Sequence, residues 1–151
     1  MTTIAYKDSI IAYDSRLTMG SSLVTDDYDK CIHSKGEIFF MSGSLSDAKS
    51  FIKAYQTGKK HSSIMNVTCF VVTKDKEILE LSYSEKRKAI ISFTLDLSEN
   101  SAIGSGWELA LGAMDAGCTA EESVKIAIGR DSYSGGNIRI FNINNGDVEI
   151  K

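Results

Sequence analysis

The chain has 151 residues, of which 42% are hydrophobic and 25% charged, and its formal net charge is −3. We expect one globular domain over residues 1–151, and no stretch approaches the roughly 20 apolar residues that cross a bilayer. The acidic balance and the short basic cluster at residues 86–88, without interleaved aromatic residues, argue against nucleic-acid binding. The chain does not open with a basic stretch followed by an apolar run, so we expect no secretory signal and a cytoplasmic protein.

The cysteines and histidines form no recognisable metal or disulfide pattern. Cys31, Cys69 and Cys118 are odd in number, widely spaced and set among apolar neighbours, which is typical of reduced core residues. His33 and His61 do not complete a zinc-site spacing with them. We therefore expect no metal and no cofactor.

Strand patterns open the chain. The runs "TIAYK" and "SIIAYD" are rich in β-branched and aromatic residues and flank Asp8, which predicts a hairpin. The runs "KCIHS" and "EIFFMSG" flank Lys35-Gly36, a turn dipeptide, and predict a second antiparallel pair.

A helical period and a meander follow. Apolar residues recur at helical spacing from residue 46 until Gly58, with Ser44 or Ser46 as N-cap and Asp47 in the first turn. They are Ala48, Phe51, Ile52 and Tyr55. Three strand-like runs come next, "NVTCFVVT", "EILELSYS" and "KAIISFTLDL".

Two helices and a hairpin complete the pattern. A helix is predicted between Gly104 and Gly117, where the second glycine suits the C′ position. Its apolar face contains Trp107, Ala110, Leu111 and Met114. Thr119 and Glu122 form a capping box for a third helix that runs to Asp131. Runs on either side of Asn145-Gly146 predict a final hairpin, and the element order favours antiparallel sheets with helices on their outer faces.

Several blocks along the chain resemble proteasome beta subunits and the related HslV peptidase. They are "TTIAY", "AYDSRLTMG", "DKCI", "FFMSGSLSDA", "AIGSGWELALGAMDAG" and "RDSYSGGNIRIF", in the family's order. The resemblance implies an α+β fold, the four-layer αββα sandwich of Ntn hydrolases. It also implies a threonine-type endopeptidase that works inside a self-compartmentalising oligomer.

Thr2 is the candidate nucleophile. A threonine hydroxyl needs a base within hydrogen-bond reach, and a free α-amino group titrates near pH 8. Once Met1 is removed, Thr2 would carry both groups. By position alone, an ordinary strand residue is the favoured interpretation of Thr2; the matched blocks reverse this preference in favour of the nucleophile.

The resemblance assigns three charged residues to the same corner. Lys30 matches the family's active-site lysine, whose ammonium favours an alkoxide-like hydroxyl. Asp14 would keep that ammonium protonated and oriented, and Arg16 would brace the corner. Without the resemblance, Lys30 is a solvated surface lysine and Asp14 an ordinary residue at a strand end.

The resemblance also assigns an oxyanion donor and a proton-relay group. Gly43 matches the glycine whose backbone N–H binds the oxyanion. Ser105, Asp131 and Ser134 match the group that holds the amino terminus. Ser105 is also explained as a helix cap, but an acid at a helix C-terminus is electrostatically unfavourable, so Asp131 favours a functional role.

Three further residues are candidates for substrate binding. Thr18 and Leu45 would pair with an extended peptide as an added strand. Met41 and Leu45 would form an apolar wall of the pocket before the cut, although both are equally explained as core.

The resemblance implies a ring or stacked rings of identical subunits, with an ATPase unfoldase as a candidate partner. Between residues 57 and 65, the family's second long helix is missing or reduced to a turn. Two alternatives remain. One is a non-catalytic assembly subunit that retains Met1, and the other is an amidase for small amides.

Overall fold

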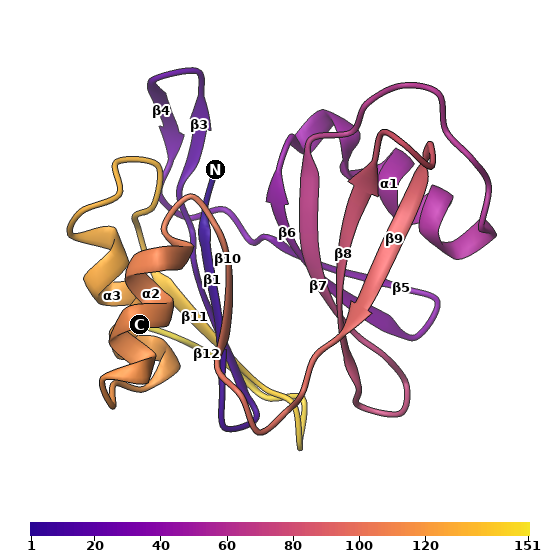
Figure 1. The fold of residues 1–151 in the computed structure, drawn as a ribbon. Helices are drawn as coiled ribbons and strands as arrows, with labels where there is room; N and C mark the ends of the chain where they lie inside the picture. Colours follow the sequence, from indigo (N-terminus) through magenta and orange to yellow (C-terminus); the bar gives the residue numbers. More distant parts are fainter. The chain divides into compact units, whose positions relative to one another are not determined.

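A computed structural model describes residues 1–151, and the chain divides into two units that are treated separately (Figure 1). Unit 1 comprises Met1–Lys30 and Asp96–Lys151, and unit 2 comprises Cys31–Leu95. None of the helices is both long and apolar enough to cross a membrane. The mixture of helices with antiparallel sheets confirms the expected α+β class.

Unit 1 is built on a five-stranded antiparallel sheet with the strand order β10-β1-β2-β11-β12. The strands are β1 (Thr3–Lys7), β2 (Ile10–Asp14), β10 (Ser101–Gly104), β11 (Ile138–Asn142) and β12 (Val148–Ile150). The first and last hairpins were expected. In the first, Asp8 and Ser9 both have positive φ, as a two-residue type I′ turn requires. Strand β10 was missed, because its four residues carry no alternating pattern.

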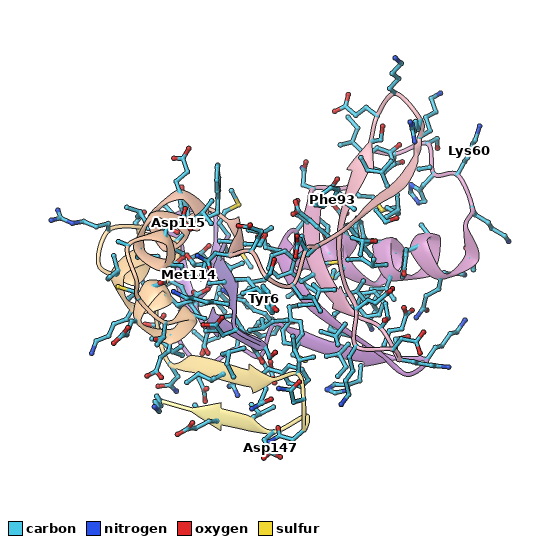
Figure 2. All side chains as sticks on the ribbon, turned by 60° about the horizontal axis from the view of Figure 1, so that its bottom comes forward. Tyr6, Lys60, Phe93, Met114, Asp115 and Asp147 are labelled. Atoms are coloured by element: carbon cyan, nitrogen blue, oxygen red, sulfur yellow. The ribbon has the colours of Figure 1, made fainter.

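Two helices cover one face of this sheet, α2 (Trp107–Asp115) and α3 (Ala120–Ile128) (Figure 1). The predicted capping box is present, with both Thr119 and Glu122 making their hydrogen bonds. Met114 is buried against the sheet, whereas its neighbour Asp115 is exposed (Figure 2). The predicted apolar face of α2 is wrong in one position, because Trp107 at its first turn is 44% exposed.

A separate two-stranded hairpin, β3 (Leu17–Met19) with β4 (Ser22–Thr25), also belongs to unit 1. Sequence analysis did not predict it, since both strands are short. Several of its apolar side chains are exposed, namely Met19, Leu23 and Val24.

Unit 2 is a second five-stranded antiparallel sheet with sequential order β5-β6-β7-β8-β9. The strands are β5 (Cys31–Ser34), β6 (Glu37–Gly43), β7 (Val67–Val72), β8 (Ile78–Ser84) and β9 (Ala89–Thr94). The predicted hairpin and meander are both confirmed. Helix α1 (Leu45–Thr57) buries Phe51 and Ile52 against one face, and Tyr55 meets Phe39 edge to face at 6.0 Å.

Helix α1 ends as expected at Gly58, whose φ of 66° is the left-handed conformation of a C-cap glycine. Ser44 occupies the N-cap position, but its side chain makes no capping hydrogen bond. Residues 58–66 contain no helix, so the second long helix of the family is absent here. Lys60 lies exposed in this segment (Figure 2). The three cysteines are free, although only Cys69 is fully buried.

Candidate active site

The pairing of three strands in unit 1 brings the first site residues together. Strand β1 lies between β2 and β10 and is antiparallel to both. The start of β1 therefore lies beside the ends of its neighbours, with Thr3 opposite Gly104 and Ile4 opposite Tyr13. This register places Thr2 beside Asp14, at the end of β2.

The Thr2 hydroxyl lies between a cation and an anion. It donates a hydrogen bond to Asp14 Oδ1 and accepts one from Lys30 Nζ. Lys30 Nζ also bonds Asp14 Oδ1 at 2.7 Å. Thr2 is 1% exposed, Asp14 0% and Lys30 6%. The predicted trio is thus a contiguous, buried cluster, and Lys30 is not the solvated surface lysine of the alternative interpretation.

Asp14 organises this corner because its carboxylate accepts from five donors. Oδ1 accepts from Thr2, from Lys30 and from the Thr3 backbone N–H at 3.0 Å. Oδ2 accepts from the backbone N–H groups of Gly135 at 2.8 Å and Arg16 at 3.1 Å. A carboxylate held at both oxygens by donors from several segments is fixed in position, so it orients Lys30 and the Thr2 hydroxyl.

The electrostatics of Lys30 are set by two opposing effects. Burial lowers the pKa of its ammonium, because the charged form loses its hydration. The Asp14 carboxylate opposes this effect, both through its charge and through its hydrogen bond. Burial and the Lys30 charge also lower the pKa of the amino group of Met1. A cation is therefore held against the Thr2 hydroxyl, and burial favours the neutral form of the Met1 amine.

A second polar group lies beside the Thr2 backbone. Asp131 Oδ2 accepts from Ser105 Oγ at 2.5 Å and from Ser134 Oγ at 2.6 Å. Ser105 Oγ lies 3.3 Å from the Thr2 carbonyl oxygen. Asp131 follows the end of α3, and its backbone N–H bonds the Ala127 carbonyl at 2.7 Å. The three residues predicted as a proton-relay group therefore form one hydrogen-bonded cluster.

Arg16 braces this corner by holding the loop at residues 132–136. Its guanidinium makes a bidentate pair with Asp26, at 2.7 and 3.0 Å, and donates to the Ser132 carbonyl at 3.2 Å. A Cβ at Gly135 would lie 2.4 Å from the guanidinium carbon, and one at Gly136 would lie 2.1 Å from the Asp26 carbonyl oxygen. The two glycines let the loop approach closely enough for Gly135 to reach Asp14.

The remaining predicted residues belong to other elements of the chain. Thr18 is in β3, in the same unit. Gly43, Met41 and Leu45 belong to unit 2. Gly43 ends β6 with a φ of 109°, and a Cβ there would lie 2.0 Å from the Asn66 carbonyl oxygen, so glycine is required. Met41 packs in the core beneath α1, whereas Leu45 is 49% exposed.

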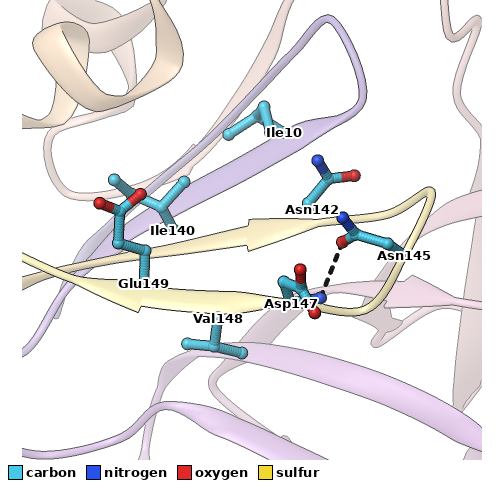
Figure 3. Close-up of a pocket in the computed structure, with 7 residues that line it drawn as sticks. All are labelled: Ile10, Ile140, Asn142, Asn145, Asp147, Val148 and Glu149. Carbon is cyan, nitrogen blue, oxygen red and sulfur yellow. Dashed lines mark hydrogen bonds between the residues drawn. The ribbon is translucent and has the colours of Figure 1, made fainter.

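A groove of about 460 Å³ lies elsewhere in unit 1, on the final hairpin (Figure 3). It is lined by Ile10, Ile140, Asn142, Asn145, Asp147, Val148 and Glu149. At the Asn145 end of the groove, the Asp147 backbone N–H donates to Asn145 Oδ1 at 2.9 Å. Ile10 and Asp14 are at opposite ends of β2, and none of the predicted site residues lines this groove.

Sequence analysis did not single out four residues that build the site. Thr3 is fully buried and bonds Ser134 Oγ at 2.7 Å. Gly106 lies against Thr3, and Gly135 and Gly136 shape the Asp14 loop. The Gly-Gly pair after Ser134 was a detectable turn signal, because two adjacent glycines favour close backbone approaches. Nothing in the local pattern distinguishes Thr3 from a strand residue.

The comparisons with known proteins identify the fold. Neither a protein-family model nor a curated protein matches the chain. Among solved structures, HslV from Trypanosoma brucei superimposes with a TM-score of 0.67 at 18% identity, covering 99% of this chain and 97% of that one. Thiobacillus denitrificans BPH in complex with epoxomicin superimposes with a TM-score of 0.64 at 19% identity, covering 93% of this chain and 96% of that one. The resemblance to this family is therefore confirmed as a likeness of fold.

The hydrogen bonds of Asp14 generate a stability prediction. Asp14→Asn should lower the free energy of unfolding by about 3–5 kcal/mol, because it leaves the buried Lys30 ammonium without its counter-charge. Asp26→Asn is the matched control, since the Arg16–Asp26 pair is partly exposed and its loss should change stability by about 1 kcal/mol or less. Urea denaturation of both variants measures the difference. Equal, small losses would contradict the central role of Asp14.

Proposed function

We propose that this protein is an N-terminal-threonine peptidase that hydrolyses peptide bonds after Met1 has been removed. The observation that carries the proposal is the Thr2 hydroxyl buried between the Lys30 ammonium and the Asp14 carboxylate. A hydroxyl in an ordinary strand does not need a buried ion pair around it, and such pairs are rarely a source of stability. The fold shared with HslV and with the epoxomicin-binding BPH supports the same conclusion.

The proposed reaction uses two groups of one residue. The free amine of Thr2 accepts the hydroxyl proton, directly or through a water, and Thr2 Oγ1 attacks the peptide carbonyl carbon. The C–N bond of the substrate then breaks, and the ammonium returns the proton to the leaving amine. Water, activated by the same amine, hydrolyses the resulting ester and regenerates Thr2.

The surrounding charges have separate roles in this proposal. Lys30 stabilises the negative charge that develops on Thr2 Oγ1, which requires the ammonium to be charged. Asp14 holds Lys30 in place, and its carboxylate is itself fixed by five donors. Ser105 contacts the Thr2 carbonyl oxygen and shares Asp131 with Ser134, and these three residues would hold the Thr2 amine. The backbone N–H of Gly43 is the proposed oxyanion donor.

The proposal includes the architecture that the resemblance implies. One domain with the four-layer sandwich of Ntn hydrolases would assemble into a ring or stacked rings of identical subunits. The exposed apolar side chains of the β3–β4 hairpin support self-association, because contacts between subunits commonly bury such surfaces. An ATPase unfoldase is the proposed partner that would feed unfolded protein to the assembly.

Substitutions of Thr2 test the nucleophile. Thr2→Ala should abolish cleavage of fluorogenic peptides while keeping the fold, because only the hydroxyl and its methyl group are removed. Thr2→Ser keeps a hydroxyl next to the amine and should retain part of the activity. Far-UV circular dichroism of the three proteins provides the control for folding. Full activity of Thr2→Ala would exclude the proposed reaction.

Peptide cleavage, intact mass and turnover of small amides together separate the two alternatives from the peptidase. A non-catalytic assembly subunit would retain Met1, as intact mass after expression in the native host would show, and would cleave no peptide. An amidase would turn over small amides and leave peptides intact.

The pocket residues generate a prediction about cleavage preference. If Met41 and Leu45 line the pocket before the cut, peptides with an apolar residue at that position should be cleaved faster than peptides with a basic or acidic one. A matched set of three fluorogenic peptides that differ only at this residue measures the preference. Equal rates for the three would argue against an apolar pocket.

The pKa shifts predict how activity depends on pH. The base must be neutral, so activity rises with pH through the pKa of the Thr2 amine, and a free α-amino group titrates near pH 8. Burial and the Lys30 charge lower the pKa of the Met1 amine one residue earlier, and the same effects should act on the Thr2 amine. Lys30 must be charged, so activity falls again as pH rises through its own lowered pKa. The kcat/KM profile should therefore be bell-shaped.

The matched variant for this profile is Lys30→Arg. A guanidinium stays protonated above pH 12, so the alkaline fall should disappear from whatever activity remains. An alkaline fall at an unchanged pH in this variant would show that another group is responsible for it.

A further inference from the structure

Thr3 places a second buried hydroxyl beside the proposed active site, and the reaction described above does not use it. Thr3 is the first residue of β1 and is 0% exposed. Its backbone N–H donates to Asp14 Oδ1 at 3.0 Å, so the same residue contacts the ion pair. Its side-chain Oγ1 lies 2.7 Å from Ser134 Oγ, which bonds Asp131. Thr3 therefore contacts both polar clusters of the site, as Thr2 also does.

The direction of these hydrogen bonds follows from the number of protons available. The Asp131 carboxylate only accepts, so Ser134 must donate its single hydroxyl proton to Asp131 Oδ2 at 2.6 Å. Having donated that proton, Ser134 Oγ can only accept from Thr3. Thr3 Oγ1 is therefore the donor, and the bonds run in one direction, from Thr3 to Ser134 to Asp131.

The space around Thr3 Oγ1 is shaped for this contact. A Cβ at residue 106 would lie 2.1 Å from Thr3 Oγ1 and 3.3 Å from Asp131 Oδ2, so only glycine fits there. Gly106 has a φ of −94°, a conformation that any residue can adopt. Its role is therefore to make room for the Thr3 hydroxyl and the Asp131 carboxylate.

We propose that Thr3 is a positioning residue for the peptidase reaction: by donating to Ser134 it strengthens the hydrogen bond that Ser134 donates to Asp131, and so weakens the attraction of that carboxylate for the proton on the Thr2 amine. The inference rests on the proposed function, because it concerns the base of that reaction. Hydrogen bonds in a chain polarise one another, so the donation from Thr3 strengthens the one from Ser134. Ser105 Oγ, which bonds the same Asp131 oxygen at 2.5 Å, lies 3.3 Å from the Thr2 carbonyl oxygen, so this cluster adjoins the main chain of the residue that carries the base.

The test compares Thr3→Val with Thr3→Ser. Valine keeps the branched shape and removes the hydroxyl, whereas serine keeps the hydroxyl. In Thr3→Val, Ser134 loses its donor and Asp131 attracts the amine proton more strongly. The acid limb of the kcat/KM profile should then move up by about 0.3–1 pH unit, the size expected for one hydrogen bond, and activity at neutral pH should fall about 2- to 10-fold. Thr3→Ser should leave the acid limb of the kcat/KM profile at its wild-type position.

A purely structural role for Thr3 would lower thermal stability and leave the acid limb where it is in the wild type. That result would overturn the proposal. If Thr3→Val does not fold, Thr3→Ala provides a second route, because it removes the hydroxyl without adding volume to the buried site. It should move the acid limb in the same direction, and an unmoved limb would also overturn the proposal.

A double-mutant cycle tests whether Thr3 acts through Ser134. In a Ser134→Ala background there is no hydroxyl to receive the bond, so Thr3→Val should have no further effect on the pH profile. An undiminished effect in that background would overturn the proposal. Failure of this inference is distinguishable from failure of the proposed function. A wild-type protein without peptidase activity, or an active Thr2→Ala variant, would refute both. An active enzyme whose pH profile is unchanged by Thr3→Val would refute this inference alone.

Discussion

The buried carboxylate of Asp14 is the constraint on which the rest of the site depends. It joins the end of β2, the start of β1, the loop after α3 and the Lys30 side chain through five hydrogen bonds. An ammonium that is 6% exposed is unfavourable by itself, and Asp14 supplies the charge that allows it to be there. The position of Lys30, and through it the environment of the Thr2 hydroxyl, follows from this one side chain.

Two clusters of different chemistry surround Thr2. Beside Thr2 Oγ1, Lys30 and Asp14 form a charged pair, and the Lys30 ammonium is placed to stabilise negative charge on that oxygen. Near the main chain, two serine hydroxyls converge on Asp131, which suits holding an amine that gains and loses a proton. Glycines at residues 106, 135 and 136 allow the surrounding segments to approach this closely. The site is thus a packed arrangement of short contacts in which added side-chain volume has little room.

The sequence was informative wherever local chemistry determines structure. The hairpin at Asp8, the Thr119–Glu122 capping box and the end of α1 at Gly58 all follow from residues adjacent in the chain, and all were predicted. Strands β3, β4 and β10 were not, because three or four residues are too few to show a periodicity. Strand β10 forms by pairing with the distant β1, whereas β3 and β4 pair with each other. The cluster of Thr2, Asp14 and Lys30 was predicted through family resemblance. Thr3 was missed because its partner Ser134 lies 131 positions away.

The central claim is that Thr2, freed of Met1, carries a reactive hydroxyl and its own base, and intact-mass spectrometry after treatment with a peptide epoxyketone tests it most directly. The ketone of such a reagent takes up a hydroxyl and its epoxide takes up an amine, so lasting capture requires both groups on one residue. We expect the treated chain to begin at Thr2 and to gain the full mass of the reagent, with the adduct mapped to that residue. A chain from its native host that retains Met1 and remains unmodified would contradict it.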